Sequence, residues 1–447
     1  MFKSIKQLFT LIVIALAIAV IIIVLPGFEW NSPEVHFLNK SEFIGLKPYG
    51  IEIEDKGKGL KSLKVFIGDD NNEKLLIDKK YESNIHTDKF EIDIKKDNIL
   101  KEGKVSLKII VHDNSKFNFF RGNKKTVKKD LILDLTPPKL IELSTVQYLN
   151  HGGSGFLIYK SSNDLEKSGV KIGDYFFPGY SGYLSDPSIY IVFFAYPYDL
   201  ESNEELSLYA IDKAGNERTL PIFYHMINAK YRDSIINIDE KFIKRKMLPL
   251  LDENVPESET MMEDIFLKVN NQMRTENNNK IKVITTNTED KIFWDNRFLQ
   301  LSNSKVEANF ADHRSYKVNK EIVDKQYHLG YDLSVTKKYP VEAANSGIVK
   351  FTGDIGIYGN TVIVDHGMGV MTLYSHLSSI SVKEGDEIKK GEIVGKTGIT
   401  GLAVGDHLHF AVYVNGVPVR PLEWWDQKWI NEKVLNRIEQ AKSEHGE

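Results

Sequence analysis

The sequence predicts a mainly β protein with an apolar N-terminal helix, two β-sandwich-like modules, a helical connector, a β domain and a C-terminal helix. Three observations lead to this order. Residues 8–25 are apolar except Thr10. Apolar and polar residues alternate through much of 30–227, between turn-forming clusters. Glycines recur at short intervals from Gly347 to Gly416, as in a β domain with tight turns.

The apolar run at 8–25 is long enough to cross a membrane, because a helix of this length spans roughly 27 Å at about 1.5 Å per residue. Lys3 and Lys6 precede it and Glu29 follows it, so the positive-inside rule predicts a cytoplasmic segment at 1–7 and a transmembrane signal anchor at 8–28. A cleaved signal peptide is the alternative, but the run is long for one and lacks a small-x-small cleavage motif. We therefore expect a single pass through the inner (cytoplasmic) membrane, with the bulk of the chain in the periplasm or outside the cell.

Composition excludes several classes of function. The net charge is −4 and no basic stripe stands out, which argues against nucleic acid as a partner. The chain contains no cysteine, so a transition-metal site must use histidine and carboxylate ligands.

Two β modules are expected at 29–139 and 140–229. Thr136-Pro137-Pro138 separates them, because proline cannot donate to a sheet ladder. Each module ends in an aspartate followed by a Gly-Asn turn, a weak internal repeat that resembles bacterial immunoglobulin-like modules or reflects only shared turn chemistry. The aromatic cluster at 175–183 is expected to be sandwich core, with a binding surface as the alternative.

A helical connector is expected at 230–300. Ile235, Ile236, Ile238, Phe242, Ile243 and Met247 suggest one helix; Met261, Met262, Ile265, Phe266, Val269 and Met273 suggest another. The β domain then covers 301–425, and a helix with an apolar stripe covers 426–447.

The candidate site is a set of side chains near the C-terminus: His328 and Asp332, His376, then His407 and His409. His328 and Asp332 share a face on either a strand or a helix, and His407 and His409 share a strand face. Two imidazoles and a carboxylate make a three-ligand zinc site with one open position, which leaves two histidines for proton transfer and charge stabilisation.

From His328 to Trp424 the chain resembles the lysostaphin/LytM-type zinc endopeptidases of peptidoglycan, peptidase family twenty-three of the metallo class. The matching stretches are HLGYD, AANSGIVKFTGDIGIYGNTVIVDHG, LYSHLSSISVKEGDEIKKGEIVGKTGITG and GDHLHF. The string TGLAVGDHLHF with the following EWWD resembles a branch of long, membrane-anchored Gram-negative relatives.

The resemblance implies a β-groove metallopeptidase domain at 301–425 with one Zn²⁺ per chain, bound by His328, Asp332 and His409. It makes His376 and His407 the catalytic pair. We expect His407 to be the general base and His376 to stabilise the oxyanion, and the two roles can be exchanged because the sequence gives no distances.

The resemblance also bears on the residues around this set. Arg314 resembles an arginine just upstream of the first ligand in many relatives and is expected to order the entry loop. Asn360 and Tyr374 are expected to line or support the substrate groove. His366 is interpreted as structural or as a support for the ligand residues. His313 is interpreted as an ordinary surface histidine, with a contact to substrate as the alternative.

Three functions compete. The first is a zinc endopeptidase that hydrolyses amide bonds in peptidoglycan peptide stems or crossbridges, anchored to the membrane by the N-terminal helix. The second is a non-catalytic regulator that binds and activates another cell-wall hydrolase. The third is a tether between wall and membrane. The complete set of three ligands and two further histidines favours the enzyme, with a regulatory protein partner as a further expectation.

Overall fold

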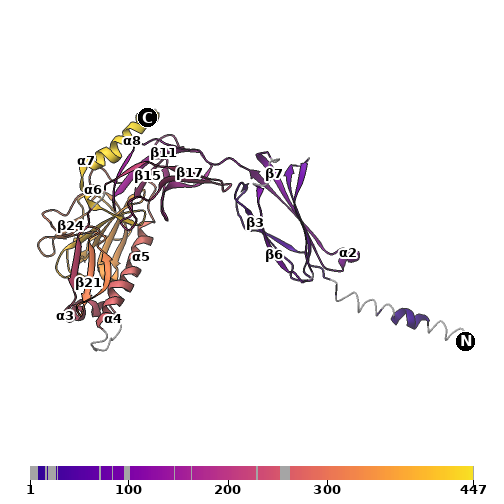
Figure 1. The fold of residues 1–447 in the computed structure, drawn as a ribbon, viewed down its shortest axis with the longest axis horizontal. Coiled ribbons are helices and arrows are strands. Elements are labelled where there is room, and N and C mark those ends of the chain that lie inside the picture. The colour runs from indigo at the N-terminus through magenta and orange to yellow at the C-terminus, as the bar shows by residue number, and fades with distance from the viewer. Residues whose placement is uncertain are drawn as a thin grey trace. The chain divides into compact units, whose positions relative to one another are not determined.

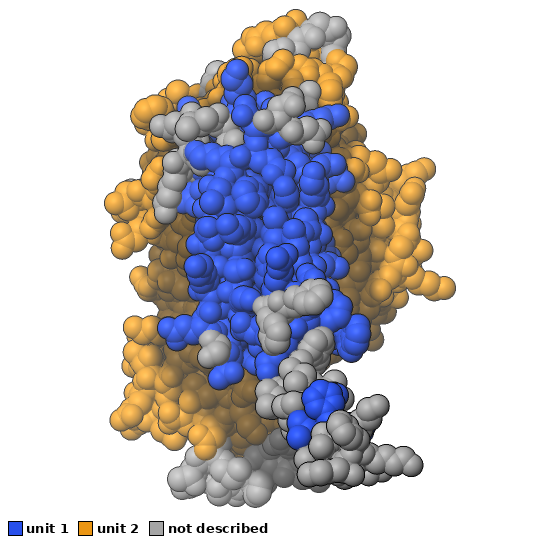
Figure 2. Space-filling view, turned by 90° about the vertical axis from the view of Figure 1, so that its right-hand side faces the viewer, with its two compact units in different colours: residues 1–138, 164–166, 211–218 blue, residues 139–163, 167–210, 219–447 orange. Residues whose placement is uncertain are grey.

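The computed structural model describes residues 9–15, 18, 27, 29–69, 72–82, 84–94, 101–144, 146–162, 164–227, 230–251 and 262–445. The chain divides into two compact units, coloured separately in Figure 2. Unit 1 comprises residues 1–138, 164–166 and 211–218, and unit 2 comprises residues 139–163, 167–210 and 219–447. Strands dominate both units (Figure 1), so the expectation of a mainly β protein is confirmed.

The expected membrane anchor at 8–28 lies mostly outside the described residues, as do Lys3 and Lys6. Residues 9–15 are helical. Within the part of the chain that the structure describes, no helix combines the length and the apolar character needed to cross a membrane.

Unit 1 contains two sheets around one core. The three-stranded sheet has the order β1-β3-β6 and the five-stranded sheet the order β2-β8-β7-β4-β5. Alternate residues of β7 are buried, as the sequence pattern predicts, and they pack with β3 and β4 into a common apolar core. The bounds are β1 Glu34–Phe37, β2 Phe43–Ile44, β3 Tyr49–Glu54, β4 Leu60–Asp69, β5 Asn72–Lys80, β6 Thr87–Ile92, β7 Gly103–Asp113, α2 Phe117–Phe120 and β8 Lys124–Leu133.

The second β module forms two four-stranded sheets, β14-β15-β11-β9 and β13-β12-β16-β17, and a parallel pair, β10-β18. The expected aromatic core is present in part: Phe177 is fully buried, whereas Tyr183 is exposed. The bounds are β9 Leu140–Glu142, β10 Gln147–Asn150, β11 Ser154–Ser161, β12 Leu165–Ile172, β13 Tyr175–Pro178, β14 Tyr180–Ser181, β15 Ile189–Ala195, β16 Leu206–Asp212, β17 Glu217–Pro221 and β18 Tyr224–Ile227.

One expectation for the connector, that its first part is helical throughout, is wrong. Ile235 and Ile236 were expected on a helix, but they lie on β19 (Asp233–Asn237), which pairs in parallel with β21 (His313–Val318). A distant pairing partner overrides the local helical spacing here, because a strand is set by the edge it joins. Helical turns follow from Glu240 to Leu250 (α3 Glu240–Phe242, η3 Ile243–Met247, η4 Leu248–Leu250). The second expected helix is present as α4 Met262–Leu267, η6 Lys268–Met273 and α5 Arg274–Thr285, and Met261 lies outside the described residues.

The C-terminal β domain is built on an eight-stranded sheet of order β20-β23-β31-β27-β26-β25-β29, with β32 paired to β31. Two three-stranded sheets, β24-β30-β28 and β19-β21-β22, accompany it. The bounds are β20 Lys305–Ala308, β22 Glu321–Tyr327, β23 Tyr331–Ser334, β24 Pro340–Glu342, β25 Gly347–Asp354, η7 Gly356–Tyr358, β26 Asn360–Gly367, β27 Val370–Ser375, β28 Ser379–Ile380, β29 Glu387–Ile388, β30 Ile393–Lys396, β31 Leu408–Val414 and β32 Val417–Val419.

The chain ends in a helical segment with the bounds α6 Pro421–Trp425, α7 Gln427–Ile430, η8 Asn431–Leu435 and α8 Asn436–His445. Its expected stripe, including Ile430 and Val434, is buried. The second module and the C-terminal domain share one core, in which Phe193 packs against Trp294 and Trp424. Both therefore belong to unit 2, except residues 164–166 and 211–218 of the second module, which belong to unit 1.

Candidate metal centre

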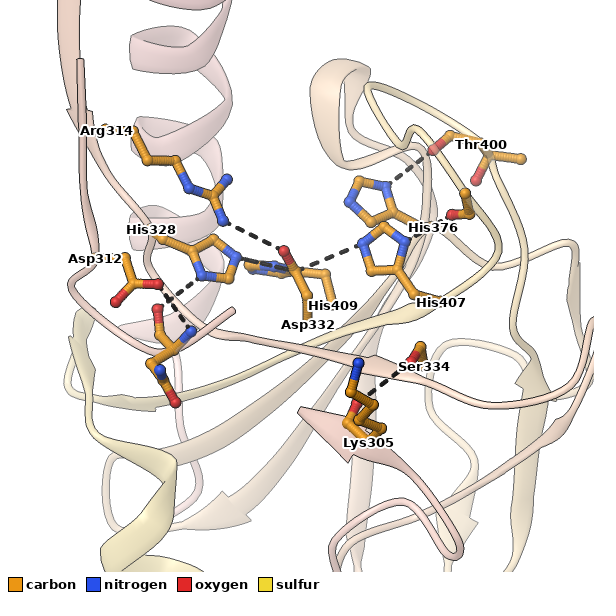
Figure 3. Close-up of polar contacts among 12 residues, drawn as sticks. Lys305, Asp312, Arg314, His328, Asp332, Ser334, His376, Thr400, His407 and His409 are labelled. Carbon is orange, nitrogen blue, oxygen red and sulfur yellow. Dashed lines mark hydrogen bonds and ion pairs between the residues drawn. The ribbon is translucent and has the colours of Figure 1, made fainter. Parts of the chain in front are cut away.

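Neighbouring strands bring the candidate residues together. Asp332 on β23 lies directly opposite His409 on β31, and His409 also lies opposite Ser375 at the end of β27. His376 follows β27 with a positive φ of 62°, a conformation that L side chains rarely adopt. This left-handed turn directs the residue after the strand toward the same site, as Figure 3 shows.

Three side-chain atoms form a tight triangle. Nε2 of His328 lies 3.0 Å from Oδ1 of Asp332 and 3.1 Å from Nδ1 of His409, and Nδ1 of His409 lies 2.9 Å from the same Asp332 oxygen. All three residues are largely buried. Ligand atoms about 2.0–2.1 Å from a tetrahedral zinc are separated by roughly 3.3 Å, so this triangle has close to the right size.

The protonation pattern also fits a metal. Nδ1 of His328 lies 2.9 Å from the carbonyl oxygen of Asn309, so the proton is assigned to that nitrogen and the Nε2 lone pair faces the triangle. Nε2 of His409 is buried without a hydrogen-bond partner. If that nitrogen carries the proton, Nδ1 of His409 also presents a lone pair to the triangle, and two nitrogens and one oxygen form a donor set that suits zinc.

His376 and His407 lie beside the triangle, with their ring centroids 4.8 Å apart. Nδ1 of His376 lies 2.9 Å from the carbonyl oxygen of Thr400, and Nδ1 of His407 lies 2.7 Å from that of Gly405. Each carbonyl fixes a proton on Nδ1 of the neutral ring and leaves Nε2 free to accept another. Nε2 of His407 is 3.5 Å from Oδ1 of Asp332.

Burial and charge act on these groups in opposite directions. Burial raises the pKa of the Asp332 carboxyl, but the neighbouring histidines outweigh it and hold that pKa well below its usual value. Burial, with repulsion from His407 and His409, holds the pKa of His376 well below its usual value. Burial lowers the pKa of His409 to about 4. Burial would lower the pKa of His407 too, but the hydrogen bond and charge of Asp332 raise it overall.

A cavity of about 970 Å³ opens onto these residues. The five candidate residues and Arg314 line it, together with Tyr358, which packs 5.5 Å from the His409 ring. Residues of β19 and the following helical turns also line it, among them Ser234, Asp239 and Arg245. The connector therefore forms one wall of the cavity.

The structure places the accessory residues differently from one another. Arg314 lies in the cavity with Nη2 3.4 Å from Oδ2 of Asp332, so it contacts a candidate ligand directly. Tyr374 is fully buried and does not line the cavity, because its hydroxyl accepts a hydrogen bond from the backbone N–H of Ala344. It can support the sheet but cannot line the groove. The Asn360 side chain donates to the carbonyl of Leu377 and is likewise absent from the cavity wall.

The two remaining histidines lie outside the set. His366 is fully buried between the carbonyl of Ser346 and the hydroxyl of Thr372, and burial lowers its pKa to about 4. His313 is partly exposed and pairs with Asp233 at 3.2 Å.

Sequence reasoning missed Tyr358, Asn309 and the strand β19 of the connector. The first two act on His409 and His328 through contacts that depend on the fold. The strand could have been found only from the pairing of β19 with β21.

Comparisons with known proteins address the same region. Residues 326–421 match the family described as Peptidase family M23. Over 95 residues, which cover 21% of this chain and 22% of the relative, the chain is 43% identical to the DD-carboxypeptidase/endopeptidase Mpg of Neisseria meningitidis serogroup B. Over 119 residues, which cover 27% of each protein, it is 34% identical to the peptidoglycan DD-endopeptidase ShyA of Vibrio cholerae. The chain thus spans about a quarter of the length of these curated relatives.

Among solved structures, the catalytic domain of lysostaphin from Staphylococcus simulans is 28% identical, with 29% of this chain and 98% of that chain covered and a TM-score of 0.25. The matched stretch begins just before His328 and ends beyond His409. It contains all five residues of the candidate set, and this protein therefore carries a peptidase family M23 domain.

Proposed function

We propose that this protein hydrolyses amide bonds in the peptide stems or crossbridges of peptidoglycan. The observation that carries the proposal is the convergence of His328, Asp332 and His409 with two further imidazoles on one cavity within the M23 domain. The names of the relatives, a DD-carboxypeptidase/endopeptidase and a peptidoglycan DD-endopeptidase, support the same substrate class.

One zinc ion per chain would be held by Nε2 of His328, Oδ1 of Asp332 and Nδ1 of His409. The buried, unpaired Nε2 of His409 and the spacing of the three atoms support this assignment. When bound, zinc would supply Lewis-acid polarisation at the scissile amide. Arg314 contacts the second oxygen of Asp332 and would orient that carboxylate.

The two remaining histidines divide the proton chemistry. We assign proton acceptance from the attacking water to His407, because the imidazolium that results would face the Asp332 carboxylate. His376 would stabilise the developing oxyanion. Because Thr400 fixes a proton on Nδ1 of His376, donation through Nε2 requires that ring to be protonated, and its lowered pKa opposes this in the resting site. The exchange of these two roles is the alternative.

The N-terminal segment belongs to the proposal as well. We propose that residues 8–25 anchor the chain in the inner membrane and that the rest lies on the side of the wall; the run of apolar residues after two lysines supports this. Protease accessibility of the full chain in intact and permeabilised cells tests it. Digestion of the bulk of the chain in the cytoplasm would contradict it.

The activity is tested by incubating purified sacculi with the zinc-loaded full chain and identifying released peptides by mass spectrometry. We expect chelator-sensitive release of products cut at one bond, and none from the His376→Ala or His407→Ala variants. If folded, zinc-loaded protein releases nothing, the enzyme proposal fails and the non-catalytic regulator becomes the better reading. Stage II sporulation protein Q of Bacillus subtilis, 30% identical over 155 residues, is named as a sporulation protein rather than as a hydrolase.

A further inference from the structure

Unit 1 contains a buried acidic cluster, cluster A, made of Glu29, Asp55 and Asp113. One carboxylate oxygen of each residue lies within 4.8 Å of the others. Asp55 and Asp113 are almost fully buried. Asp113 accepts from the backbone N–H groups of Ser115 and Asn123 and from the Asn123 side chain. The Asn123 side chain also donates to the backbone carbonyl of Glu29, which ties the segment before β1 to the turn after β7.

A second cluster in unit 1, cluster B, repeats this construction with Asp134, Asp164 and Asp212. Asp212 accepts from the N–H groups of Ala214 and Asn216 and from the Asn216 side chain. The Asn216 side chain donates to the carbonyl of Asp134, as Asn123 does to Glu29. The weak Asp…Gly-Asn repeat of the sequence is therefore a repeat of side-chain geometry.

The hydrogen bonds within each cluster leave part of its negative charge without compensation. Both carboxylate oxygens of Glu29 are buried, and neither makes a hydrogen bond of good geometry. Oδ1 of Asp164 is buried and unpaired in the same way. Burying a carboxylate without a partner is costly, because the charged group loses its hydration. These unpaired oxygens point into groups of like charge, where a cation would be the missing partner.

Local packing and electrostatics also indicate that a cation would stabilise these carboxylates. Gly57 leaves room for the Glu29 carboxylate, since a Cβ there would collide with it. Burial, with the charges of Asp55 and Asp113, raises the pKa of Glu29 despite the nearby Lys58. Burial, with the charges of Asp212 and Asp164, raises the pKa of Asp134 as well.

We propose that clusters A and B each bind one calcium ion. Their side-chain donors are oxygens only, with three carboxylates each, and Ca²⁺ takes six to eight oxygen ligands in flexible geometry. Mg²⁺ demands a near-ideal octahedron and usually keeps several waters around one or two carboxylates. Neither cluster includes an imidazole, so zinc, which would suit the His328 site, is not the expected ion.

Calcium binding to the zinc-saturated full chain, measured by isothermal titration calorimetry, tests the proposal. The informative variants are Glu29→Gln and Asp164→Asn, because they remove the charge, keep the size of the side chain, and act where the two Glu29 oxygens and Oδ1 of Asp164 hold no good hydrogen bond. Glu91→Gln is the matched control, since Glu91 is exposed on β6 of the same unit.

We expect two calcium ions per wild-type chain and per Glu91→Gln chain, one for each single variant, and none for the double variant. Magnesium at the same concentration should not compete measurably. The proposal is overturned if the wild-type chain binds no calcium at millimolar concentration, or if the two single variants both keep two ions. Calcium should also raise the thermal transition of unit 1 in the wild type but not in the double variant. Circular dichroism of each variant without calcium shows whether it has folded, so that lost binding is not confused with unfolding.

Discussion

The candidate metal centre of unit 2 and the acidic clusters of unit 1 are both groups of buried ionisable side chains, but they are built from different donors. The centre in unit 2 combines two imidazoles with one carboxylate and has two further imidazoles beside it. Each cluster in unit 1 has three carboxylates and is closed by backbone N–H groups and an asparagine. The ligand atoms of each group determine which cation it suits. The side chains beside the ligands determine whether a bound cation could assist a reaction. Of these three groups, the centre in unit 2 is the one with imidazoles beside it, and an imidazole can accept and donate a proton near neutral pH.

The largest effect should come from removing a zinc ligand. His409→Ala should abolish both zinc binding and peptide release, because it deletes one of three protein ligands. Zinc content by atomic absorption and release from sacculi measure the two losses. His313→Ala, which changes a partly exposed histidine outside the set, is the control and should keep both. A fully active, zinc-loaded His409→Ala protein would refute the ligand assignment.

Removing a neighbouring imidazole should separate binding from chemistry. His407→Ala should keep zinc and lower turnover on the order of 10²–10⁴-fold, the usual contribution of general acid–base catalysis. His376→Ala should also keep zinc, and a smaller loss for it would favour His407 as the base. If His407→Ala lost its zinc, His407 would have to be counted among the ligands.

The sequence predicted the chemistry of this site better than its walls. The HLGYD, LYSHL and GDHLHF strings identify the five residues, and the register of β23 with β31 places Asp332 opposite His409. For Tyr374 the sequence left two roles open, lining or supporting the groove, and its burial in the core, where its hydroxyl accepts from the Ala344 backbone, is compatible with the supporting role. The strand in the connector was missed because Ile235 and Ile236 form it only through β21, more than 70 residues away in the chain.

The fold, like the site, has some features that local sequence patterns predict and others that depend on distant contacts. In the first β module, local alternation fixes the buried face of strands such as β7, so the sequence was sufficient. The shared core of the second module and the C-terminal domain depends on contacts such as Phe193 with Trp424. No local pattern encodes a contact between residues so far apart in the sequence.

A mutation that opens a cavity in the unit 1 core should lower the stability of unit 1 and leave that of unit 2 unchanged. Leu107 is fully buried in β7, so Leu107→Ala should destabilise unit 1 by about 2–5 kcal/mol. Because the core of unit 1 is separate from those of unit 2, differential scanning calorimetry should show only one transition shifting. The exposed change Lys125→Ala serves as control. Equal shifts of both transitions would show that the units unfold as one.

The smallest expected effect is a pH dependence of the stability of unit 2 that comes from one buried carboxyl group. Glu423 is buried and accepts from the Asn150 side chain and the Ser154 backbone, and burial raises its pKa to about 7. The folded state therefore holds this proton more tightly than the unfolded state. The resulting stability is fully present below about pH 4.5 and is lost as pH rises through about 7, by at most about 3 kcal/mol.

Glu423→Gln should flatten this part of the stability profile, measured by denaturant unfolding of unit 2 between pH 4.5 and 8. Glu387→Gln, an exposed change on β29, should leave the profile as it is in the wild type. An unchanged slope in Glu423→Gln would assign the pH dependence to another group.

The strand β19 has a consequence for ligand selectivity. The stretch that matches the family runs from residue 326 to 421, whereas Ser234 and Arg245 of the cavity wall lie well before it. A small inhibitor that contacts only the candidate metal centre would meet residues that lie within this stretch. A larger compound that also contacts Ser234 and Arg245 would bind residues outside the stretch that matches the family. Such contacts are a route to selectivity for this protein.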